Sequence, residues 1–87
     1  MKNKSNFINN LFKIIEKKSK SKDKKSYTKS LLKNGKNKIA QKLGEESTEL
    51  IIDYLNGSKK RTIEEASDLI YHLFVLLSSK KINYQDI

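Results

Sequence analysis

Two long stretches of the chain, residues 36–56 and 62–80, carry apolar residues at the three- and four-residue spacing of an amphipathic helix. No proline, the strongest helix breaker, occurs anywhere in the 87 residues. The second stretch opens with Thr62 and has Glu65 three residues later, which is the T-x-x-E pattern of a capping box. We therefore expect two long helices, joined by a charged link that ends in Lys59-Lys60-Arg61.

Shorter helices are expected on either side of this pair. Apolar residues at helical spacing predict a helix over about residues 5–18, and Gly35 closes a short helical segment that starts near Ser26. Residues 83–87 are expected to start a last short helix, and no segment alternates convincingly with the period of a strand. The predicted fold is all-α, a small bundle of four to five helices in a single domain over residues 1–87.

The chain is small for an independent core. A chain of this length hides only about 60–65% of its unfolded surface, and residues 62–80 are apolar nearly all round in their second half. We therefore expect a homodimer in which a second copy completes the core.

Composition excludes several kinds of site. The absence of cysteine rules out disulfides, thiolate metal ligands and a cysteine nucleophile. No apolar run is long enough to span a membrane and the start does not resemble a signal peptide, so a cytoplasmic location and no membrane partner are expected. Residues 1–42 have a formal charge of +12 and residues 43–87 of −3. This asymmetry suits a polyanionic ligand held by lysine and a metal, although a general bias toward lysine would also produce it.

The acidic residues fall in two pairs at helical spacing. Glu46 and Glu49 lie on the first long helix, Glu65 and Asp68 on the second, and residues three apart project from one side of a helix. If the helices pack antiparallel, four carboxylates converge and repel unless a divalent cation lies among them; oxygen ligands favour Mg²⁺ or Mn²⁺ over zinc. Alternatively the acids lie on solvated surfaces, with Glu64 and Glu65 complementing the helix dipole. The spacing alone leaves both interpretations open.

Three segments together resemble the phosphoribosyl-ATP pyrophosphatases, a family of the MazG-type all-α nucleotide pyrophosphohydrolases. The segments are Ser26-Tyr27-Thr28, residues 38–49 (KIAQKLGEESTE) and residues 65–73 (EASDLIYHL). The wider superfamily is marked by E-E-x-x-E followed by E-x-x-D, and the added S-Y-T and Y-H matches favour the specific family. The resemblance covers about residues 5–87.

The resemblance implies a reaction and roles for individual residues. The reaction is Mg²⁺-dependent hydrolysis of 1-(5-phospho-β-D-ribosyl)-ATP to the AMP form and pyrophosphate, an early step of histidine biosynthesis, in a helical bundle completed by dimerisation. The implied metal ligands are Glu46, Glu49, Glu65 and Asp68. The implied catalytic carboxylates are Glu46, Glu49 and Glu45, the last as a fifth carboxylate or as the base for the attacking water. Lys38 and Lys42 are implied to meet the phosphates, and the implied substrate contacts are Ser26, Tyr27 and Thr28.

Two other functions remain as alternatives. The same carboxylates would serve an enzyme that hydrolyses noncanonical or deoxynucleoside triphosphates. A basic helical protein that binds nucleic acid is disfavoured, because it does not explain the paired acids and no aromatic residues interleave the lysines; no nucleic-acid partner is expected. The single histidine, His72, is interpreted as packed and hydrogen-bonded, with orientation of a proton-transfer group as the alternative.

Overall fold

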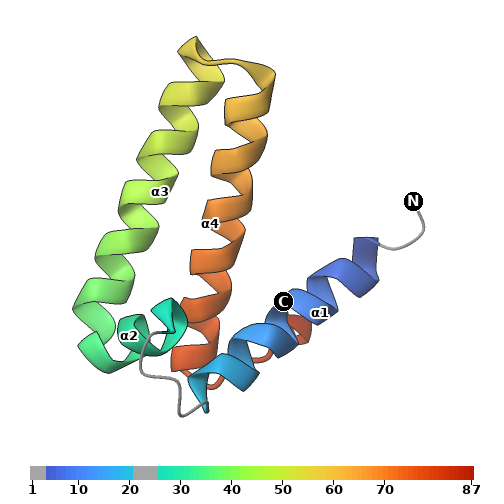
Figure 1. Ribbon diagram of the computed structural model, residues 1–87, viewed down its shortest axis with the longest axis vertical. Helices are drawn as coiled ribbons and strands as arrows, with labels where there is room; N and C mark the ends of the chain where they lie inside the picture. The colour runs from blue at the N-terminus through green and yellow to red at the C-terminus, as the bar shows by residue number, and fades with distance from the viewer. Residues whose placement is uncertain (1–3, 21–25) are drawn as a thin grey trace.

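The computed structural model describes residues 4–20 and 26–87, and over these residues it is built from helices (Figure 1). The elements, in chain order, are α1 (Lys4–Ser19), α2 (Tyr27–Asn34), α3 (Lys36–Asn56), α4 (Lys59–Ser79) and the short 3₁₀ helix η1 (Tyr84–Asp86). This confirms the all-α bundle and the short helix near the C-terminus. The helix predicted over about residues 5–18 is α1, and residues 21–25 lie outside the described part. Among the described residues, no helix has the length and apolar character needed to cross a membrane.

The helices α3 and α4 form an antiparallel hairpin, and α1 and α2 lie across one end of it (Figure 1). Gly35 separates α2 from α3 with φ +92° and ψ −179°, a conformation that residues with a Cβ rarely adopt. The glycine therefore lets the chain leave α2 and turn directly into α3. The predicted long helix over residues 36–56 is confirmed.

The start of α4 differs from the prediction. The helix begins at Lys59, where the side chain of Ser58 caps it by accepting a hydrogen bond from the backbone N–H of Arg61 at 3.1 Å. The predicted T-x-x-E cap at Thr62 is wrong, because the Thr62 hydroxyl donates instead to the carbonyl oxygens of Ser58, at 2.9 Å, and Asp53, at 3.2 Å. Serine is a good N-cap, and lysine and arginine are good helix formers, so the earlier start adds a turn at little cost.

The core lies where α1 and α2 meet the hairpin. Its buried apolar side chains are Phe12, Ile15, Leu31, Ile39, Phe74, Val75 and Leu77. At the other end of the hairpin, no other described element covers α3 and α4 (Figure 1). Large apolar side chains at that end are exposed. The radius of gyration, 13.6 Å, exceeds the about 12 Å expected of a compact domain of this length, as a protruding hairpin requires.

Candidate active site

Three carboxylates converge in the middle of the α3–α4 hairpin. Glu46 and Glu49 project from α3 and Glu65 from α4, and one oxygen of each lies within 4.8 Å of the others. Glu46 and Glu65 are buried, each with 8% of its surface exposed, while Glu49 is exposed. The antiparallel packing considered from the sequence is thus present, and it brings acids from the two helices together.

Two of these carboxylates each have a buried oxygen without a partner. The Oε1 atoms of Glu46 and Glu65 accept no hydrogen bond from any described residue. Burial raises the pKa of Glu65, and the neighbouring carboxyls of Glu49, Asp68 and Glu46 raise it further. An unpartnered buried carboxylate oxygen is costly, and an all-oxygen donor set suits a hard divalent cation. The three side chains therefore fit a cation of the Mg²⁺ type.

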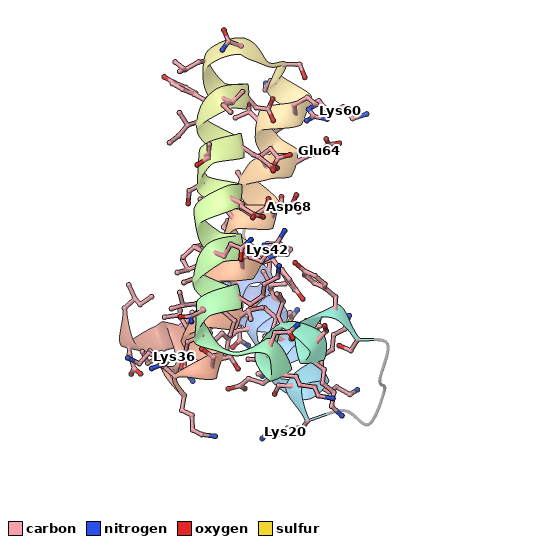
Figure 2. All side chains as sticks on the ribbon, turned by 90° about the vertical axis from the view of Figure 1, so that its left-hand side faces the viewer. Lys20, Lys36, Lys42, Lys60, Glu64 and Asp68 are labelled. Atoms are coloured by element: carbon pink, nitrogen blue, oxygen red, sulfur yellow. The ribbon has the colours of Figure 1, made fainter. Side chains whose placement is uncertain are left out.

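Asp68, the fourth predicted ligand, lies beside the three converging carboxylates. Its side chain is exposed and its charge reaches Glu65, but it is not one of the three whose oxygens lie within 4.8 Å. Figure 2 shows Glu64, Asp68 and Lys42 one below another along the hairpin. Asp68 thus borders the three converging carboxylates on the side where Lys42 lies.

Lys42 and Glu45 form a polar group of their own next to the carboxylates. Lys42 Nζ donates to Glu45 Oε1 at 3.2 Å and lies 3.8 Å from Glu46 Oε2. Gln41 donates to the other Glu45 oxygen at 2.8 Å. Hydrogen bonds from Gln41 and Lys42, with a smaller effect of the Lys38 charge, lower the pKa of Glu45. The Glu45 carboxylate is therefore hydrogen-bonded to residues of its own helix, α3, and is not one of the three converging carboxylates.

The Ser26-Tyr27-Thr28 segment packs against α4, where Tyr71 and His72 lie. Ser26 caps α2 by accepting a hydrogen bond from the Lys29 N–H at 3.2 Å. Thr28 is buried, and its hydroxyl is hydrogen-bonded to that of Tyr71. Burial raises the pKa of Tyr71. Of the three predicted substrate contacts, Thr28 is thus buried and hydrogen-bonded within the fold, whereas the side chain of Tyr27 is half-exposed.

His72 is buried and hydrogen-bonded through both ring nitrogens. Its Nε2 lies 2.9 Å from the Tyr27 hydroxyl, and its Nδ1 lies 2.7 Å from the backbone carbonyl oxygen of Asp68. With 7% of its surface exposed, it is the packed, hydrogen-bonded histidine that the sequence indicated.

The sequence did not predict that the side chain of Arg61 lies near the carboxylates. Arg61 Nη2 lies 3.7 Å from Asp53 Oδ2 and 4.0 Å from Glu65 Oε2. Arg61 was assigned to the charged link, whereas the early start of α4 places it on the helix, one turn before Glu65. The four-residue spacing between Arg61 and Glu65 was the available signal.

Comparison with known proteins identifies the family of the chain. The family described as phosphoribosyl-ATP pyrophosphohydrolase matches residues 8–87. The chain is 49% identical over 82 residues to the phosphoribosyl-ATP pyrophosphatase of Sulfolobus acidocaldarius, spanning 94% of this chain and 86% of the relative. The corresponding protein of Sulfurisphaera tokodaii is 43% identical over 95% of this chain and 88% of its own length. The histidine biosynthesis bifunctional protein HisIE of Bacteroides thetaiotaomicron is 46% identical over 93% of this chain, which spans only 40% of that longer protein. The chain therefore belongs to the phosphoribosyl-ATP pyrophosphohydrolase family.

Proposed function

We propose that the chain catalyses the Mg²⁺-dependent hydrolysis of 1-(5-phospho-β-D-ribosyl)-ATP to 1-(5-phospho-β-D-ribosyl)-AMP and pyrophosphate. Family membership supports the reaction and its place in histidine biosynthesis. The observation that carries the metal requirement is the convergence of Glu46, Glu49 and Glu65, in which two buried oxygens lack a hydrogen-bond partner among the described residues. These three residues and the adjacent Asp68 would hold Mg²⁺, with Mn²⁺ as the alternative ion.

Lys38 and Lys42 supply positive charge that can offset the negative charge of the substrate phosphates. A bound Mg²⁺ contributes charge neutralisation at the phosphates and Lewis-acid activation of water. Lys42 lies beside the carboxylates, and Lys38 lies one turn earlier on α3, so both can meet phosphate oxygens entering from the α2 side. Phosphoryl transfer depends chiefly on positioning and electrostatic stabilisation. The chain therefore needs no nucleophilic side chain.

We assign Glu45 to the positioning of Lys42. The family resemblance implied that Glu45 is a fifth carboxylate of the site or the base for the attacking water. Hydrogen bonds from Gln41 and Lys42 occupy its carboxylate and lower its pKa, which makes it a weaker proton acceptor. Glu49 is the exposed member of the converging three, so its carboxylate is the one that solvent water reaches.

A second copy of the chain is the proposed partner of the hairpin end. Large apolar side chains on the distal half of the hairpin are exposed by half or more: Ile51, Ile52, Tyr54, Leu55 and Ile63. Fully burying one such side chain contributes about 1.5–3 kcal/mol. Together they offer on the order of 5 kcal/mol or more to a homodimer.

The experiment that tests the reaction is pyrophosphate release from phosphoribosyl-ATP, with Mg²⁺ and with EDTA. A panel of noncanonical and deoxynucleoside triphosphates is run in parallel. We expect Mg²⁺-dependent release from phosphoribosyl-ATP alone. Release from the other triphosphates instead would contradict the proposed substrate and keep the metal site. Undiminished release in EDTA would contradict the metal requirement.

A further inference from the structure

The hydrogen bonds of His72 determine where its proton lies. A backbone carbonyl oxygen only accepts hydrogen bonds, so the 2.7 Å contact with Asp68 O requires the hydrogen on Nδ1. In the neutral imidazole the other nitrogen, Nε2, is then an acceptor. The Tyr27 hydroxyl, 2.9 Å from Nε2, must therefore donate its hydrogen to His72.

The Tyr27 ring is held so that its hydroxyl stays in this place. It stacks on Tyr71 with ring centroids 6.0 Å apart and meets the His72 ring edge-on at 5.8 Å. The Tyr71 hydroxyl is itself fixed by the buried Thr28. Two contacts from α4 thus orient a side chain that is 49% exposed.

The Tyr27 hydroxyl lies beside the candidate site, because its partner His72 is one turn of α4 after Asp68, the residue that borders the converging carboxylates. The hydroxyl directs its hydrogen to His72. What it offers a ligand is a lone pair.

We propose that His72 is a positioning residue that makes the Tyr27 hydroxyl an acceptor toward the substrate, so that Tyr27 binds a hydrogen-bond donor of the nucleoside part and not a phosphate oxygen. Ionised phosphate oxygens are acceptors, and two acceptors facing each other repel. The donors available on the substrate are sugar hydroxyls and base N–H groups. This inference rests on the proposed function for its ligand, but its claim about the His72 proton does not.

The proton position is tested by nitrogen NMR of the imidazole in the wild-type protein at neutral pH. His72 is the only histidine in the chain, so both ring nitrogen signals belong to it. Nε2 is distinguished from Nδ1 because it couples to both carbon-bound ring protons. We expect a protonated Nδ1 and an unprotonated Nε2, and the variant Tyr27→Phe should shift the Nε2 signal because it removes the donor. A protonated Nε2, in the neutral ring or in the imidazolium, would overturn the inference.

The ligand preference is tested by calorimetric titration with phosphoribosyl-AMP and, separately, with pyrophosphate, each with Mg²⁺. Tyr27→Phe and His72→Phe should each weaken phosphoribosyl-AMP binding by about 5–10-fold, the effect of one lost hydrogen bond, and leave pyrophosphate binding unchanged. The double variant should lose no more than either single variant, since His72 acts through Tyr27. His72→Gln, which returns an acceptor to the Tyr27 hydroxyl, should restore part of the affinity.

Two comparisons complete the test. Lys42→Ala should weaken pyrophosphate binding, while Lys36→Ala, a matched change at an exposed lysine elsewhere on α3 (Figure 2), should not.

Loss of the Tyr27 effect with a ligand lacking the 2′-hydroxyl would identify that hydroxyl as the donor; a persisting effect would point to another sugar hydroxyl or the base. Equal weakening of both ligands by Tyr27→Phe would overturn the inference. Failure of the wild type to hydrolyse phosphoribosyl-ATP would overturn the proposed function instead, and the NMR result would be unaffected.

Discussion

The buried carboxylates of Glu46 and Glu65 have neither their charge nor their hydrogen-bonding capacity fully satisfied by the described protein. Each is 8% exposed and keeps one oxygen without a hydrogen-bond partner among the described residues. Lys42 and Arg61 approach them, at 3.8 Å and 4.0 Å, which is longer than a charge-assisted hydrogen bond. Lost hydration and mutual repulsion are therefore only partly offset. The proposed divalent cation would offset this repulsion, because an all-oxygen donor set suits such an ion.

Glu46→Gln is expected to reduce Mg²⁺-dependent pyrophosphate release from phosphoribosyl-ATP by at least about 100-fold, because an amide removes a charge from the metal-binding group. The melting temperature in EDTA should be no lower than that of the wild type, since repulsion is relieved. Turnover and circular dichroism melts measure the two effects. The matched control is Glu64→Gln, the same change at an exposed residue beside Glu65, which should leave turnover within about twofold. Near-normal activity of Glu46→Gln would contradict the metal assignment.

The raised pKa of Glu65 gives a pH dependence of stability with a definite sign. Its pKa lies above the ordinary value of 4.5, chiefly because of burial and the Glu49 carboxyl. Between the unfolded and folded pKa values, folded Glu65 binds more protons than unfolded Glu65, so the free energy of unfolding falls as pH rises. Urea unfolding in EDTA across the acidic range should show this fall, and Glu65→Gln should lessen it. Mg²⁺ should restore stability above the folded pKa. Equal pH slopes in the wild type and the variant would contradict this expectation.

At the scale of elements, two glycines of the α2–α3 region have opposite requirements. Gly35 has φ +92° between the helices, whereas Gly44 lies inside α3, where no described atom beyond the neighbouring helix backbone comes within 4 Å of the place that a Cβ would occupy. Gly35→Ala should therefore destabilise the protein by about 1–3 kcal/mol. Gly44→Ala should stabilise it by about 1 kcal/mol, the gain in helix propensity. Urea unfolding of the two variants measures both changes.

The activity of Gly44→Ala adds information that its stability does not. A glycine inside a helix often marks a close approach by another backbone or a ligand, and no described residue makes such an approach to Gly44. Unchanged turnover would assign Gly44 no role in the site. A loss of turnover in the more stable variant would show that substrate or a second copy approaches α3 at this point.

Local spacing predicted the helices well and the contacts between them less well. The acid pairs followed from three-residue spacing once α3 and α4 were known to be antiparallel. The start of α4 was wrong because Thr62-x-x-Glu65 and Ser58 are both acceptable caps, and which one is used depends on the contact with Asp53 across the hairpin. The Tyr27–His72 contact joins residues 45 apart in the sequence. No periodicity encodes such a contact: the family resemblance drew attention to Tyr27, and His72 was noted as the single histidine without a partner being identified.

At the scale of the whole molecule, the core and the candidate site occupy different parts of one hairpin. The apolar core is at the end covered by α1 and α2, and the converging carboxylates lie farther along, toward the end that nothing in the described chain covers (Figure 1). Helical periodicity places Leu55 and Ile63 on apolar faces, but both are exposed. The pattern thus identified surfaces for burial without distinguishing the chain's own core from an interface, since both require the same residues.

Leu55→Glu is expected to convert the proposed homodimer to a monomer, because Leu55 is 68% exposed among the apolar side chains at the hairpin end and a charge there cannot be buried cheaply. Sedimentation equilibrium at micromolar concentration should give twice the chain mass of 10.1 kDa for the wild type and the single-chain mass for the variant. The wild-type melting temperature should rise with protein concentration, as for any dimer coupled to folding, and that of the variant should not. Ile87→Glu, the same kind of change at a side chain that is 85% exposed away from the hairpin end, should remain dimeric. A wild-type protein that sediments as a monomer would show that the exposed apolar residues do not pair two copies.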